Sequence, residues 1–257
     1  MVKPAPQTIR ITPDVWEALA SHAEPFETPN DALRRLLGLC DPTPTAYLDG
    51  PVVEDVSDRR AEEIIQPITR PTRLWTANAV LSDSSLIPEQ SGVYGVYFKS
   101  VPPQVPTVGC VLFQDFTLLY AGISSEKPKA GRAPSKQTLR DRILFHLTGN
   151  AERSTLRLSL GSLLAATIGI QLRKYGGSKT FGRAGEAKLS DWMAANLAFV
   201  WSEHEEPWSV EQTLLAQITF PLNIQHNRHQ PFAVVLSRLR SAAKAAAESL
   251  PPMSSNA

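Results

Sequence analysis

The chain has 257 residues, of which 42% are hydrophobic and 20% are charged, and its formal net charge at pH 7 is +1. This composition supports one large folded domain or two small ones and excludes a globally disordered chain. No run approaches the ~18 apolar residues of a membrane helix, the N-terminus lacks an apolar signal core, and two cysteines fit no zinc-finger spacing. We therefore expect a cytoplasmic protein without a membrane partner.

The first predicted unit covers residues 7–39. Ile9 and Ile11 alternate with polar residues, as in a half-buried strand. Thr12 and Thr28 each precede a proline, which is typical of a helix N-cap followed by proline at the first helical position. One strand and two short helices cannot bury a core alone.

This strand-helix-helix pattern resembles ribbon-helix-helix DNA-binding domains, which form a core by dimerising. The resemblance implies that residues 1–40 mediate a homodimer. It also implies that Thr8 and Arg10, on the outward face of the strand, contact DNA. The alternative is an ordinary cap on the main domain.

The rest of the chain divides into a linker over residues 41–75, which contains prolines and acids, and a domain over residues 76–250. The domain has alternating strand and helix signals, which predict an α/β (α+β) fold with a small mixed or antiparallel sheet flanked by helices. We expect strands near 92–98, 108–113, 117–123 and 198–201, and helices near 138–148, 155–170, 189–197, 211–218 and 231–249.

Positive charge is concentrated in residues 123–188, which contain thirteen lysines and arginines but only four acids. Such a block favours a polyanion partner, although a solvated surface is the alternative. We expect double-stranded DNA as the partner, because the loop 125–136 and the following helix present cations that can follow a phosphate backbone. The predicted contacts are Lys127, Lys129, Arg132, Lys136 and Arg140. Residues 173–179 are either a second contact or a hairpin turn.

Two short tyrosine motifs carry the chemical signal: Gly92-Val93-Tyr94 and Tyr120-Ala121-Gly122, each in a predicted strand. Arg142, His146 and Glu211 follow in predicted helices. Hydrolysis of a phosphodiester needs a group that takes a proton from water and positive charge that neutralises the pentavalent phosphate. A divalent metal can supply part of that charge and needs a hard oxygen ligand.

In order and spacing, residues 88–230 resemble the GIY-YIG nuclease superfamily. The resemblance implies a DNA endonuclease that uses Mg²⁺ or Mn²⁺. Restriction or another form of host defence, mobile-element transfer and repair are all compatible with it. It implies that Tyr94 contacts the nucleophilic water and acts, directly or through a neighbour, as the general base. It also implies that Tyr120 organises the phosphate and the water.

The same resemblance assigns the remaining site residues. Arg142 corresponds to the arginine that holds the scissile phosphate, and His146, one helical turn further, to a histidine that shares in proton transfer in restriction enzymes. Glu211 corresponds to the metal-binding carboxylate. Asn223 corresponds to an asparagine that braces the site.

Several alternatives remain at this point. Tyr97 competes with Tyr94 for the first motif, but the strand period puts the two on opposite faces. The run from His226 to His229 suggests a polar loop near the cleft rather than a metal site. A non-catalytic ribbon-helix-helix regulator with a basic platform domain is the second functional hypothesis, and a nuclease for RNA or junctions is the third.

Overall fold

The computed structural model describes residues 63, 65–128, 135–224 and 231–252, all of which belong to the unit Glu54–Ala257. The strand-helix-helix prediction for residues 7–39, with Thr8 and Arg10, lies outside the described residues. So do Lys129 and Arg132 of the basic loop, and the run His226–His229.

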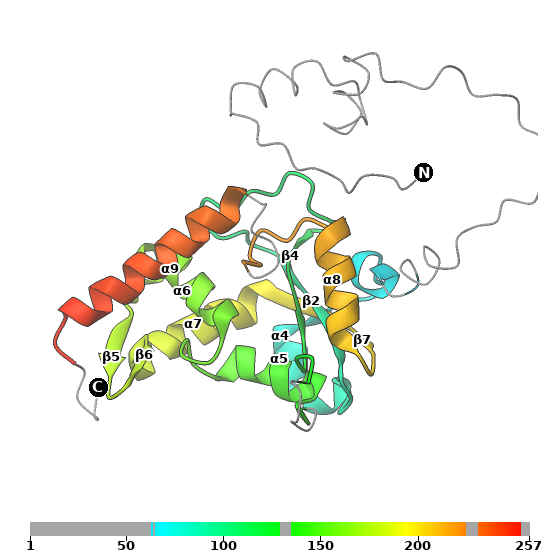
Figure 1. The fold of residues 1–257 in the computed structure, drawn as a ribbon, viewed down its shortest axis with the longest axis horizontal. Coiled ribbons are helices and arrows are strands. Elements are labelled where there is room, and N and C mark those ends of the chain that lie inside the picture. The colour runs from blue at the N-terminus through cyan, green and yellow to red at the C-terminus, as the bar shows by residue number, and fades with distance from the viewer. Residues whose placement is uncertain (1–62, 64, 129–134, 225–230, 253–257) are drawn as a thin grey trace, which may run out of the picture. The chain divides into compact units, whose positions relative to one another are not determined.

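The centre of the domain is a five-stranded antiparallel sheet in the order β1-β7-β2-β4-β3 (Figure 1). This confirms the predicted sheet flanked by helices. The third strand is shorter than the predicted 108–113. The strands are β1 (Trp75–Thr76), β2 (Gly92–Phe98), β3 (Leu112–Phe113), β4 (Phe116–Ile123) and β7 (Leu197–Glu203).

Helices cover the sheet on both faces (Figure 1). Side chains from five of them share one hydrophobic core with Tyr94 and Tyr120. Helix α8 (Pro207–Gln217) packs in a second hydrophobic core. The five helices that share a core with the two tyrosines are α4 (Ala77–Ser82), α5 (Leu139–Thr148), α6 (Thr155–Ile168), α7 (Gly182–Asn196) and α9 (Pro231–Ser249). A 3-10 turn, Ser84–Leu86, follows α4.

Strand β2 contributes to both cores, because its side chains alternate between the two faces. Tyr94 and Phe98 pack in the core of the five helices, whereas Val93 and Tyr97 pack in the core of α8. Ile68 also packs in the α8 core, with its side chain fully buried. Residues just before β1, in the stretch expected to be a linker, therefore contribute to the folded domain.

A β-bulge in β4 changes which face its side chains occupy. The register against β2 shifts at this point, since Val96 pairs with Tyr120 but Tyr97 pairs with Leu118. Leu118 and Tyr120 are two residues apart and would share a face in a regular strand. Because of the extra residue Leu119, they lie in different cores, and Tyr120 faces the same side as Tyr94.

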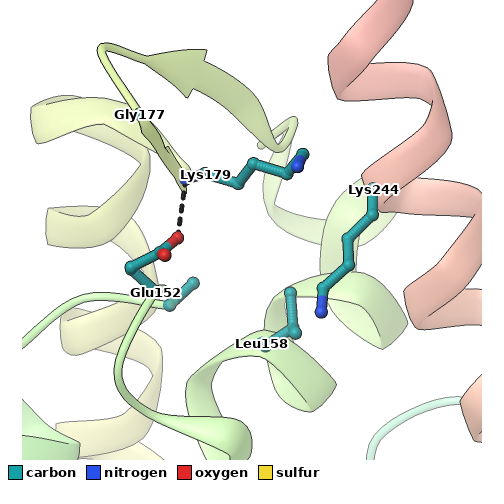
Figure 2. Close-up of a pocket in the computed structure, with 6 residues that line it drawn as sticks. Glu152, Leu158, Gly177, Lys179 and Lys244 are labelled. Atoms are coloured by element: carbon teal, nitrogen blue, oxygen red, sulfur yellow. Dashed lines mark hydrogen bonds between the residues drawn. The ribbon is translucent and has the colours of Figure 1, made fainter.

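The stretch 173–179 forms the hairpin that was one of its two predicted structures, with strands β5 (Arg173–Tyr175) and β6 (Ser178–Thr180). Figure 2 shows a small cavity between this hairpin, α6 and α9, where Glu152 accepts a hydrogen bond from the backbone of Lys179. None of the tyrosines of the two motifs lines this cavity. Within the described residues, no helix combines the length and apolar character needed to cross a bilayer.

Candidate active site

A chain of hydrogen bonds runs from the first-motif tyrosine into the helical layer. The Tyr94 hydroxyl lies 2.6 Å from Nε2 of His146, and Nδ1 of His146 lies 2.7 Å from the Ser154 hydroxyl. Tyr94 and His146 are fully buried, and so is Ser154, the N-cap of α6. The capping box of Thr138 and Asp141 fixes the start of α5 and with it the position of His146.

The hydrogen-bond network indicates which histidine nitrogen carries the hydrogen. Ser154 Oγ already accepts a hydrogen bond from the backbone N–H of Arg157. Among the described residues, Nδ1 of His146 is the acceptor that remains for the Ser154 hydroxyl hydrogen. We therefore infer that Nε2 carries the imidazole hydrogen and donates it to the oxygen of Tyr94.

The two ionisable residues linked by these hydrogen bonds, Tyr94 and His146, are both neutral at physiological pH. Burial lowers the pKa of His146 well below its ordinary 6.5, and the positive charges of Arg142 and Arg157 lower it further. Burial raises the pKa of Tyr94 well above 10, with Tyr120 adding to the rise and Arg142 opposing it. The resting site thus holds a neutral imidazole and a protonated phenol.

The second-motif tyrosine lies beside the first. The ring centroids of Tyr94 and Tyr120 are 6.4 Å apart, and those of Tyr120 and His146 are 6.1 Å apart. Burial raises the pKa of Tyr120, while its hydrogen bond with Thr155 and the charge of Arg142 lower it. Three aromatic side chains from three elements therefore meet at one point of the domain.

Arg142 completes this group with a permanent positive charge. It is half-buried on α5, one turn before His146, and its charge acts on both tyrosines. Its Nε is buried without a hydrogen-bond partner among the described residues. A buried guanidinium donor without a partner is a feature expected where an anion binds.

Glu211 reaches this group from α8. Its neighbours Val210 and Leu214 pack in the α8 core, yet the Glu211 carboxylate is close enough to contribute to the raised pKa of Tyr120. Among the described residues, no three His, Cys, Asp or Glu side chains gather as a multidentate metal site. One carboxylate fits a Mg²⁺-type ion, which completes its shell with waters and phosphate oxygens.

Asn223 braces the edge of β4. Its side-chain oxygen accepts from the N–H of Ala121 at 3.0 Å, and its side-chain nitrogen donates to the carbonyl of the same residue at 2.7 Å. Ala121 is the middle residue of the second motif. Asn223 therefore fixes the backbone next to Tyr120.

The motif glycines are explained by close contacts. A Cβ on Gly122 would collide with the hydroxyl of Tyr94, which lies directly over it. A Cβ on Gly92 would collide with the backbone oxygen of Ser202 on β7. Gly122 thus leaves space for the Tyr94 hydroxyl, and Gly92 allows β2 and β7 to pair closely.

Several of the basic residues form ion pairs with acids of the same domain. Arg157 is fully buried and forms an ion pair with Glu186, and it also donates to the carbonyl oxygens of His146 and Leu147. Arg140 pairs with Glu89. The basic block therefore presents less free charge than its sequence suggests.

The remaining predicted DNA contacts differ in their surroundings. Lys127 and Lys136 are exposed at the two ends of the basic loop. On the hairpin, Lys174 and Lys179 both pair with Glu248 of α9.

Arg240 of α9 also lies close enough to Tyr120 for their charges to interact, and sequence reasoning did not predict it as a site residue. Burial lowers its pKa, and the neighbouring Tyr120 opposes that shift. The signal that could have revealed it is its place on the apolar stripe of α9, four residues after the buried Leu236.

The fold and the clustered phenols, guanidinium and carboxylate are those expected of a phosphodiester hydrolase. The family model of the GIY-YIG catalytic domain matches residues 92–242, more than half of the chain, and the chain belongs to this family. It is therefore an endonuclease, and DNA is the substrate that the family implies. Searches of curated proteins and of solved structures gave no significant match.

Proposed function

We propose that the protein is a metal-dependent endonuclease of a restriction or defence type that cleaves double-stranded DNA with Mg²⁺ or Mn²⁺. The observation that carries the proposal is the convergence of Tyr94, Tyr120, His146 and Arg142 on one buried point, with the charge of Glu211 acting on it. Each of these groups has a role in moving a proton or in holding a phosphate.

Tyr94 is proposed to receive the proton of the attacking water. Its oxygen faces the hydrogen-bond donors His146 and Arg142, which stabilise the phenolate, but burial keeps the resting phenol protonated. The active form is the phenolate, so the rate of cleavage should rise with pH above neutrality, approaching one log unit per pH unit. A rate that is flat between pH 6 and 9 under single-turnover conditions would contradict this role.

Arg142 and Tyr120 are proposed to hold the phosphate. The buried and unpartnered Nε of Arg142 supplies a donor, and the guanidinium matches two phosphate oxygens in one plane. Glu211 is the proposed metal ligand, and a divalent cation held there would supply positive charge to polarise a phosphoryl oxygen and to favour ionisation of nearby groups. Asn223 positions the strand that carries Tyr120.

The proposed organisation of the chain is a ribbon-helix-helix-like segment at residues 1–40, a linker that begins at residue 41, and a nuclease domain that includes the core residues Ile65 and Ile68 and continues to residue 250. The first segment would form a homodimer and contact DNA through Thr8 and Arg10. Lys127, Lys129, Arg132, Lys136 and Arg140 would follow the backbone near the nuclease site. Light scattering at micromolar concentration that finds only monomer would contradict the dimer.

A plasmid-nicking assay tests the enzymatic proposal. Wild type should convert supercoiled plasmid to nicked or linear DNA with Mg²⁺ or Mn²⁺ and not with EDTA. Glu211→Gln and Arg142→Ala should lose this activity while keeping the wild-type circular dichroism spectrum. The matched controls Glu206→Gln and Arg153→Ala change exposed residues on the same or a neighbouring element and should remain active.

Tight DNA binding by wild type without any metal-dependent cleavage would favour the regulator instead. Parallel digestion of duplex DNA, RNA and a branched junction would identify the substrate class. Sequencing the ends released from a random DNA library would then give the cleavage position and any sequence preference.

A further inference from the structure

Arg240 is a charged residue on the inward face of α9. Phe232, Leu236 and Ala247 of this helix are buried, and Ala243 packs against the same core. Their spacing of three and four residues defines one stripe along the helix, and Arg240 belongs to it. The side chain of Arg240 is half-buried. A guanidinium thus occupies a position where the pattern calls for an apolar side chain.

Arg240 has no carboxylate partner among the described residues, unlike Arg140, which pairs with Glu89, and Arg157, which pairs with Glu186. Placing a charge in a partly desolvated position without a counter-ion costs stability. Proteins keep such costly residues mainly at functional sites. The ionisable neighbour of Arg240 is Tyr120, whose hydroxyl belongs to the proposed site.

The position of Arg240 is fixed from both sides along α9. Before it, Phe232 and Leu236 anchor the helix in the core that also contains Tyr120. After it, Glu248 pairs with Lys174 and Lys179 of the β5–β6 hairpin. Figure 1 shows α9 running along α6 toward that hairpin, and Lys179 of the hairpin and Lys244 of α9 both line the cavity in Figure 2. Arg240 therefore belongs to a helix that contacts the rest of the domain on both sides of it.

We infer that Arg240 binds a phosphate of the DNA held at Tyr120, as a second guanidinium in addition to Arg142. This inference rests on the proposed endonuclease function. The buried Nε of Arg142 lacks a hydrogen-bond partner among the described residues, and Arg240 lacks a carboxylate partner there, so two guanidiniums without a described counter-ion act on the same phenol. A bound phosphodiester would supply the counter-charge that both lack.

The test compares Arg240→Met with Arg238→Met. Methionine keeps an unbranched apolar side chain on the stripe, and Arg238 is an exposed arginine on the same helix, two residues earlier. Arg240→Met should lower kcat/KM for DNA cleavage by about tenfold to a hundredfold, as expected for losing a hydrogen bond to a charged group. Its melting temperature should equal or exceed that of wild type. Arg240→Lys should recover part of the rate, because lysine keeps the charge but not the planar fork.

Each outcome has one meaning. If wild type cleaves DNA and Arg240→Met cleaves as fast as Arg238→Met, the inference is wrong and the endonuclease proposal stands. If Arg240→Met lowers the melting temperature by several degrees and lysine does not restore the rate, Arg240 is a packing residue and the inference is wrong. If wild type does not cleave with either metal ion, the proposed function fails.

DNA binding tests the inference even in that last case. In fluorescence anisotropy, Arg240→Met should bind duplex DNA more weakly than Arg238→Met, and the salt dependence of its affinity should correspond to about one phosphate contact fewer. Equal affinities and equal salt slopes for the two variants would overturn the inference.

Neutral phosphate analogues can then locate the contact. Single methylphosphonates are placed at and around the mapped cleavage position. At the phosphate that Arg240 contacts, Arg240→Met should cause no further loss, because the charge it recognises is already absent. Losses that multiply at every position tested would exclude a direct contact with any of these phosphates.

Discussion

Tyr94 and Tyr97 lie three residues apart on β2, both fully buried and both with a phenol pKa raised by burial, yet their hydroxyls meet different groups. The Tyr97 hydroxyl donates to the backbone carbonyl of Ile68 at 2.8 Å, and the chain of contacts ends there. The Tyr94 hydroxyl meets His146 at 2.6 Å, and the contacts continue to Ser154. The first arrangement holds the fold together, and the second can transfer a proton.

The two faces of the sheet therefore differ in chemistry as well as in packing. On the Tyr97 side, the residues that contact the sheet from α8 are apolar, as in Val210 and Leu214. On the Tyr94 side, the helices contribute His146 and Arg142 next to the phenols. Burial alone does not identify a functional tyrosine; the groups around its hydroxyl do.

Replacing each tyrosine by phenylalanine should give the largest contrast. Tyr94→Phe removes the proposed proton acceptor and should lower the single-turnover cleavage rate by about 10²- to 10⁴-fold. Tyr97→Phe should leave the rate within about twofold of wild type. It should instead cost about 1–3 kcal/mol of unfolding free energy, because the carbonyl of Ile68 loses its buried donor. Quenched-flow cleavage and urea denaturation of both variants check this, and equal rates would remove the distinction.

Glycine-to-alanine changes on the two faces should give a smaller contrast. Gly122→Ala pushes a methyl group against the Tyr94 hydroxyl, so cleavage should fall by about a hundredfold, the cost of misplacing a reacting group by about 1 Å. On the other face, a Cβ on Gly95 meets Ile68 at 2.9 Å and Leu118 at 3.0 Å. Gly95→Ala should therefore lower the melting temperature and spare the rate per folded molecule. Rates and melting curves measured together would show whether the two effects separate.

His146 should make stability depend on pH. The folded protein keeps its imidazole neutral, while the unfolded chain protonates it below the ordinary pKa of 6.5. The unfolded state thus binds more protons, and stability present above pH 6.5 is lost as the pH falls, by up to about 1.4 kcal/mol per unit. Urea midpoints between pH 7.5 and 5 should show a shallower slope in His146→Gln than in wild type.

The smallest effect is expected at Ser154, which supports His146 and caps α6. Ser154→Ala should lower the unfolding free energy by about 1 kcal/mol, the usual cost of losing an N-cap side chain. Ser154→Thr keeps a hydroxyl that can cap the helix and should recover much of this loss. Thermal melts of both variants provide the measurement, and an unchanged alanine variant would count against the inferred hydrogen bond.

Much of this arrangement follows from local sequence rules. Alternation along β2 puts Tyr94 and Tyr97 on opposite faces, as predicted, because the strand is regular there. The four-residue step from Arg142 to His146 puts both side chains near Tyr94, because α5 is a regular helix with a fixed start. These relations depend on neighbours in the chain, which a sequence displays directly.

Other features depend on partners far away in the sequence. The bulge at Leu119 has no glycine or proline to mark it. Arg157 is one of the cations of the basic block, but it is buried and forms an ion pair with Glu186, 29 residues later. No local pattern indicates this pair. The position of Arg240 is different, because its spacing of four residues from the buried Leu236 already places it on the apolar stripe of α9. The bulge and the ion pair of Arg157 depend on tertiary contacts, which local sequence patterns do not show.

The bond between Asn223 and Ala121 has a consequence for solubility. Among the described residues, β3 pairs with the first residues of β4 and no further along it. At Ala121 the amide of Asn223 takes both backbone groups that a further strand would use. Leu222 donates in the same way to the carbonyl of Leu119. An open strand edge is a template for intermolecular pairing and aggregation. Here a single side chain and the segment next to it close that template.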